Sequence, residues 1–150
     1  NTEVVVSDVL NWRWPLEFVG DSVVCAVAWL LIAFLAALRR EMAAVNVFVG
    51  YLFVLAGIFG TLTVANLADG LQLEALNHFM SFIPPLWLGL ATFFDQKHFL
   101  RSLVIFGLVH NAGRIVEAAL LNYSVAKYLS VFYTTGSVVL VTCSILLVFR

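Results

Sequence analysis

The chain has 150 residues, of which 63% are hydrophobic and 11% are charged, and its formal net charge is −1. A typical soluble domain carries about 25% charged residues, so this chain has too few polar side chains to cover a water-exposed surface, and we expect lipid to surround most of it. It has no basic run and no nucleic-acid-binding motif, which excludes nucleic acid as an expected partner. Since no long linker and no internal repeat divides the chain, we expect a single domain over residues 1–150.

Residues 1–16 are expected to form an extramembrane segment. Trp12 and Trp14 precede Pro15, an arrangement typical of an anchor at the membrane–water interface, where indole rings lie among lipid headgroups. Pro15 suits the first turn of a following helix, because its missing N–H has no partner there in any case. Since the sequence starts at Asn1 and not at Met, we expect that its N-terminus was processed or truncated, or that further sequence precedes Asn1.

The first predicted membrane span runs from about Glu17 to Leu38. Glu17 and Asp21 are four residues apart, so both carboxylates share one face of the first turns. Acidic residues favour the N-terminal end of a helix dipole, which accounts for Glu17. Asp21 lies deeper in the span and is a candidate ligand-binding residue.

The second predicted span runs from about Met42 to Leu67. It contains the small residues Ala56, Gly57 and Gly60, which are typical of helices that pack closely in lipid. The threonines near its end are expected to bond back to helix carbonyls. That leaves Asn66 as the candidate binding residue of this span.

The third predicted span runs from about Ala75 to Phe94 and contains Pro84 and Pro85. Because proline removes a backbone N–H and disturbs a helix interior, two alternatives remain open. One is a single spanning helix that is kinked at the prolines, and the other is a short interfacial helix followed by a tilted or half-spanning one. His78 is a candidate site residue in either case.

The fourth predicted span, Arg101 to Asn122, carries His110, Arg114 and Glu117 in its interior. At about 100° per residue, these side chains fall within an arc of about 60° on one helix face. Ionisable groups inside a membrane helix are costly and normally face protein or a water-filled cavity, so this face is the predicted centre of function. The alternative is a purely structural ion pair between Arg114 and Glu117.

A fifth predicted span, about Leu129 to Phe149, has no ionisable residue and is expected to serve packing or lipid contact. Five spans place the two termini on opposite sides of the membrane. The loops of one side then hold five basic residues, and those of the other side hold two: Arg39, Arg40, Lys97, Arg101 and Arg150 against Arg13 and Lys127. The positive-inside rule therefore predicts an outside N-terminus and a cytoplasmic C-terminus, in a bacterial-type inner or plasma membrane. The candidate residues would gather in the outer part of the bundle, as a polar recess closed on the cytoplasmic side.

We predict no metal site, and the sequence identifies no cofactor. Cys25 and Cys143 lie in separate apolar stretches without the spacing of a zinc site, and a packing role is expected for both. Asp21, Glu117 and His78 have donor types that suit a metal, but not a metal-binding spacing.

The leading hypothesis is a membrane module that binds a small amphipathic or anionic ligand and acts in sensing or transport. Its candidate ligand-binding residues are His110, Arg114, Glu117, Asp21, His78 and Asn66. One alternative is an accessory or structural subunit of a larger membrane complex of respiratory or photosynthetic type. Another is an intramembrane enzyme on a lipid-like substrate, with Glu117 or Asp21 as general acid or base and His110 as proton partner. The expected partners are the lipid bilayer, a small or lipid-like ligand, and either further copies of the chain or the other subunits of an assembly.

Overall fold

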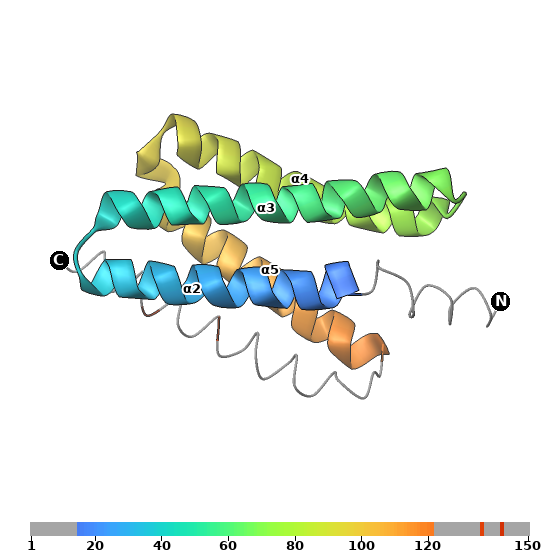
Figure 1. Ribbon diagram of the computed structural model, residues 1–150, viewed down its shortest axis with the longest axis horizontal. Coiled ribbons are helices and arrows are strands. Elements are labelled where there is room, and N and C mark those ends of the chain that lie inside the picture. The colour runs from blue at the N-terminus through green and yellow to red at the C-terminus, as the bar shows by residue number, and fades with distance from the viewer. Residues whose placement is uncertain (1–14, 122–135, 137–141, 143–150) are drawn as a thin grey trace.

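The computed structural model describes residues 15–121, 136 and 142, and within this part of the chain the fold is helical, without a strand (Figure 1). The elements are the π-helix η1 (Pro15–Gly20), α2 (Asp21–Ala37), α3 (Glu41–Ala68), α4 (Gln72–Phe94), the 3₁₀-helix η2 (Gln96–His98) and α5 (Phe99–Leu121). The all-helical prediction is thus confirmed for these residues. The tryptophans of the expected interfacial anchor and nearly all of the predicted fifth span lie outside the described residues.

The helix boundaries follow the predicted spans closely, with two differences at proline residues. Helix begins at Pro15, so the last two residues of the expected extramembrane segment are already helical. Helix α4 runs without interruption through Pro84 and Pro85, so the alternative of two separate helices is wrong. Each proline removes only one backbone hydrogen bond, and α3 packs along α4 in the most extensive helix pair of the described fold.

One described helix is long and apolar enough to cross a membrane. Helix α3 has 28 residues, which at about 1.5 Å per residue exceeds the roughly 30 Å hydrocarbon core of a bilayer. Helix α2, at 17 residues, is a shorter apolar helix. Of the five predicted spans, only the one that corresponds to α3 is supported by helix length and composition within the described residues.

The turns that end α2 and α3 have the same hydrogen-bond pattern. After α3, Gly70 has φ 75°; its N–H donates to Leu67 O at 3.1 Å, and the N–H of Leu71 donates to Asn66 O at 2.9 Å. This is a Schellman motif, in which a left-handed residue follows the helix and is usually glycine. After α2 the equivalent position is Arg39, with φ 59°. A side chain in this conformation costs roughly 1–2 kcal/mol.

We expect Arg39→Gly to relieve that strain. The comparison is Arg39→Ala, which removes the same charge but keeps a Cβ. The glycine variant should be more stable than the alanine variant by about 1 kcal/mol. The greater conformational entropy of glycine in the unfolded chain reduces this difference by a few tenths of a kcal/mol. Unfolding of the two variants in mixed detergent micelles measures the difference. Equal stabilities would show that residue 39 leaves the left-handed region at no cost.

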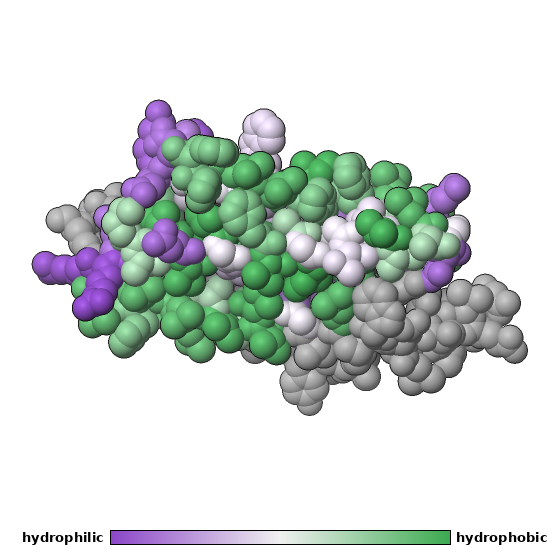
Figure 2. All heavy atoms as spheres, turned by 45° about the horizontal axis from the view of Figure 1, so that its top comes forward, coloured by the Kyte–Doolittle hydropathy of each residue, from purple (hydrophilic) through white to green (hydrophobic). Residues whose placement is uncertain are grey.

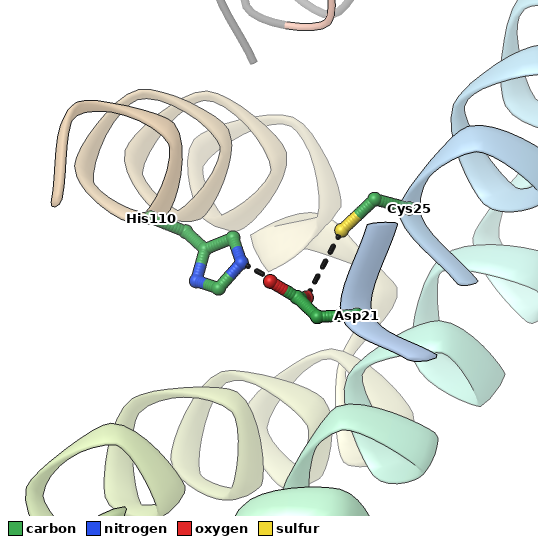
Figure 3. A group of neighbouring side chains, drawn as sticks. All are labelled: Asp21, Cys25 and His110. Atoms are coloured by element: carbon green, nitrogen blue, oxygen red, sulfur yellow. Dashed lines mark hydrogen bonds and ion pairs between the residues drawn. The ribbon is translucent and has the colours of Figure 1, made fainter. Parts of the chain in front are cut away.

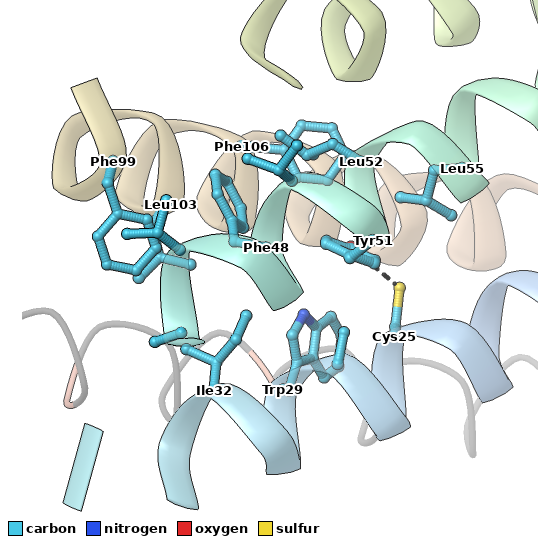
Figure 4. Close-up of a cluster of buried hydrophobic side chains, with 14 of the residues drawn as sticks. Cys25, Trp29, Ile32, Phe48, Tyr51, Leu52, Leu55, Phe99, Leu103 and Phe106 are labelled. Atoms are coloured by element: carbon cyan, nitrogen blue, oxygen red, sulfur yellow. Dashed lines mark hydrogen bonds between the residues drawn. The ribbon is translucent and has the colours of Figure 1, made fainter. Parts of the chain in front are cut away.

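A buried apolar core holds α2, α3 and α5 together (Figure 4). Phe48 of α3 is 1% exposed and meets the ring of Phe99, from the start of α5, edge-on with centroids 5.6 Å apart. Ile32 of α2 and Leu103 of α5 are fully buried in the same cluster. This packing fixes the position of α5 relative to α2 and α3. It therefore also determines which residues of α2 and α3 the polar side chains farther along α5 can reach.

On the face shown in Figure 2, the most hydrophilic of the described residues lie towards the two ends, and mostly apolar side chains lie between them. Leu30, Phe34 and Trp87 are 69%, 61% and 71% exposed. The α2–α3 and α4–α5 turns lie at the same end (Figure 1). In the latter turn, the N–H of Lys97 donates to Asp95 Oδ1 at 3.1 Å, and this hydrogen bond lowers the pKa of the Asp95 carboxyl.

Candidate functional site

The candidate site is built around the carboxylate of Asp21, which is 0% exposed at the start of α2. Cys25 Sγ lies 3.3 Å from Oδ1, and Nε2 of His110 lies 3.2 Å from the same oxygen (Figure 3). Arg114 Nε donates to Oδ2 at 2.9 Å. Because an ionised carboxylate only accepts hydrogen bonds, Cys25 and His110 both donate to it. A buried charge of this kind is stable only when it is paired and hydrogen-bonded.

Glu17 of η1 lies on the same face of the chain's first helical stretch as Asp21 and Cys25 of α2. Glu17, Asp21 and Cys25 follow one another at intervals of four residues, so they share a helix face. Tyr51 of α3 extends this row of side chains across the helix interface, since its hydroxyl lies 3.2 Å from Cys25 Sγ (Figure 4). The chain of contacts therefore runs from α3 through α2 to α5.

Arg114 is the cation of the site and contacts two carboxylates. Besides its bond to Asp21, its Nη1 lies 3.6 Å from Oε1 of Glu17. Its guanidinium also lies over the ring of Phe59, 5.3 Å from the centroid, a distance at which the ring face attracts a cation. The Arg114 side chain is 7% exposed, so these partners replace most of its water.

His78 and His110 both lie against the ring of Phe59. His78 of α4 stacks on Phe59 with centroids 6.4 Å apart, and His110 meets that ring edge-on at 6.4 Å. His78 Nε2 is also 3.8 Å from Oε2 of Glu17. We call the residues Glu17, Asp21, Cys25, His78, His110 and Arg114 the Asp21 cluster. It joins η1, α2, α4 and α5 around Phe59 of α3.

A cleft of about 570 Å³ opens beside the cluster. Its polar lining includes Glu17, His110 and Arg114, together with Asn77 and Ser81 of α4. The rest of its wall is apolar and comes mainly from α4 and α5: Met80, Pro84, Pro85, Leu88, Ile105, Phe106, Val109 and Val116. Pockets with an apolar wall and a few converging polar groups are the usual form of a small-molecule site.

The structure brings together three of the six predicted site residues directly and a fourth through Glu17. Asp21, His110 and Arg114 are in contact, and His78 joins them at Glu17. Asn66 is buried on α3 and is not among the described residues that line the cleft. Glu117 lies within α5, but its side chain is outside the described part of the structure.

Four residues of the site were not predicted from the sequence. Glu17 was assigned to the helix dipole and Cys25 to packing, although their positions four residues either side of Asp21 place all three on one helix face. That spacing was the available signal. No sequence signal identifies Tyr51 or Phe59 as site residues, because an aromatic residue in an apolar helix is ordinarily a core residue.

No protein-family model matches this sequence, and comparison with curated proteins and with solved structures found no match either.

Proposed function

We propose that this chain is a multi-pass membrane protein that binds a small amphipathic molecule in the cleft between α4 and α5, in sensing or transport. The ligand's apolar part would lie along the cleft wall, and its polar head would meet Glu17, His110 and Arg114. The observation that carries the proposal is the cleft, whose lining combines a few charged and polar side chains with a larger number of apolar ones.

The membrane location is supported by the apolar exterior. Large apolar side chains are exposed on each of α2, α3, α4 and α5, and apolar residues make up most of the described surface on the face shown in Figure 2. A large exposed apolar surface is otherwise a site of association or aggregation in water. Helix α3 meets the length and composition of a span. Arg39, Arg40 and Lys97 belong to the two turns at the same end of the molecule, and Arg101 lies in the first turn of α5 beside them (Figure 1). This arrangement suits a cytoplasmic position for that end.

The charges of the described cluster favour a head that donates hydrogen bonds. Asp21 and Glu17 supply two negative charges and Arg114 one positive charge, so one negative charge remains when both histidines are neutral. An anionic head would have to displace Glu17 from Arg114. An ammonium or hydroxyl head instead finds Glu17 at the cleft edge, where its side chain is 16% exposed.

The test is binding of a single-chain alkylammonium probe with a fluorescent tail to the full chain in nanodiscs. Val109 lines the cleft and is 66% exposed, so Val109→Trp should fill the cleft without disturbing the core. We expect it to weaken binding at least about tenfold, or ~1.4 kcal/mol.

The matched control is Leu30→Trp, which enlarges a side chain that is 69% exposed on α2 and that does not line the cleft. It should bind the probe as the unmodified chain does. A fatty acid of the same length should bind more weakly than the ammonium probe. Equal binding by the Val109→Trp and Leu30→Trp variants would rule out the cleft as the binding site.

A further inference from the structure

The geometry points to a binding site for a zinc-like divalent metal ion at Asp21, Cys25 and His110. One ligand atom from each of these residues lies within 4.8 Å of the other two, and the three side chains converge on one place from α2 and α5 (Figure 3). This inference shares His110 with the proposed cleft site, and its test uses the metal ion alone, without the cleft ligand. It also revises the packing role expected for Cys25.

Two of the three separations between donor atoms are those of a metal's coordination shell. Oδ1 of Asp21 is 3.3 Å from the Cys25 sulfur and 3.2 Å from Nε2 of His110. Tetrahedral zinc has bonds of about 2.3 Å to sulfur and about 2.0–2.1 Å to nitrogen or oxygen, which puts neighbouring ligand atoms roughly 3.3–3.6 Å apart. The third pair, the Cys25 sulfur and His110 Nε2, lies within 4.8 Å, so these two side chains would move closer together around the ion.

The neighbours of these donors hold the Asp21 carboxylate in place. Arg114 bonds to Oδ2 of Asp21, and a metal would bind Oδ1 in place of the hydrogen bonds from Cys25 and His110. The Tyr51 hydroxyl, 3.2 Å from the Cys25 sulfur, is a candidate fourth donor. His110 lines the cleft, which gives water a route to the same position. Hydrogen bonds that orient metal ligands in this way are a regular part of protein metal sites.

Charge and donor type both favour a divalent ion with affinity for sulfur and nitrogen. When the ion binds, the Cys25 thiol gives up its proton to water and the thiolate sulfur forms the bond to the metal. The Nε2 proton of His110 also leaves, and Nδ1 takes up a proton from water, so that the neutral imidazole binds through Nε2. Two positive charges enter and one negative charge appears, which offsets the single negative charge left by Asp21, Glu17 and Arg114. Thiolate and imidazole donors suit Zn²⁺, whereas Ca²⁺ and Mg²⁺ require oxygen.

The test is titration of the chelator-treated full chain in detergent with Co²⁺, which occupies zinc sites and gives a thiolate-to-metal absorption band only when a cysteine binds it. We expect the band to saturate at one Co²⁺ per chain and to disappear when Zn²⁺ is added. Zn²⁺ should also raise the Tm of the unmodified chain. If the unmodified chain gives no thiolate band, the proposal is wrong.

Variants then identify the ligands. Cys25→Ser should abolish the band, and His110→Gln should weaken Co²⁺ binding at least tenfold, while circular dichroism confirms that both remain helical. Cys143→Ser and His98→Gln are the matched controls, because they remove the chain's other cysteine and a histidine of η2. A band that survives Cys25→Ser and is lost in Cys143→Ser would overturn the assignment. If a site variant fails to fold, the Co²⁺ titration of the unmodified chain still tests whether a cysteine binds the metal.

Discussion

Replacing Arg114 with Gln is expected to destabilise the fold by about 3–5 kcal/mol, the cost of breaking a buried ion pair by removing one partner. Arg114 is the cation that Asp21 and Glu17 share, at 2.9 Å and 3.6 Å. Without it, two carboxylates would face each other in a site where Asp21 is 0% exposed. Unfolding by SDS in mixed micelles, followed by circular dichroism, measures the loss.

A second substitution separates the effect of charge from that of lost packing. In the Arg114→Gln background, Asp21→Asn removes one of the two uncompensated charges, so the double variant should be more stable than Arg114→Gln alone. Asp21→Asn by itself should cost less than Arg114→Gln, because Arg114 keeps Glu17 as a partner. If the two single losses simply add, the guanidinium contributes through its contact with Phe59 and not through the carboxylates.

The sequence predicted that buried charges would meet, but it did not predict which of them would pair. Ionisable groups within apolar stretches have to find partners, and this argument, together with the predicted orientation of the spans, placed Asp21, His110 and Arg114 in one site. Arg114 was also considered as a partner of Glu117 within its own helix. The structure gives Arg114 partners on η1 and α2, and pairing between distant segments depends on helix packing, which residue spacing does not encode.

The same distinction holds for the fold. The boundaries of α3 were predicted to within one residue at each end, because a long apolar run between polar turns fixes both ends of a span. The course of α4 through Pro84 and Pro85 was left open, since the local cost of a proline is weighed against packing along α3. Such packing appears only once the helices are placed together.

Gly136 tests how the predicted fifth span packs. This buried glycine is helical, and a Cβ at its position would overlap the indole ring of Trp29 on α2. Because Trp29 is only 4% exposed in the core, its ring has little room to move. We expect Gly136→Ala to cost about 1–3 kcal/mol through overpacking, measured as a lower SDS midpoint of unfolding.

Gly57→Ala is the matched control for that substitution. Gly57 is also a helical glycine, and a Cβ there would meet nothing within 4 Å. Alanine is the better helix former by roughly 0.5–1 kcal/mol, so this variant should be as stable as the unmodified chain or more so. If Gly136→Ala lowers the stability and Gly57→Ala does not, the cost of Gly136→Ala comes from the contact with Trp29. Replacing Trp29 with Leu in the Gly136→Ala background should then recover stability. A Gly136→Ala variant that gains stability as Gly57→Ala does would mean that the predicted fifth span does not press its residue 136 against α2.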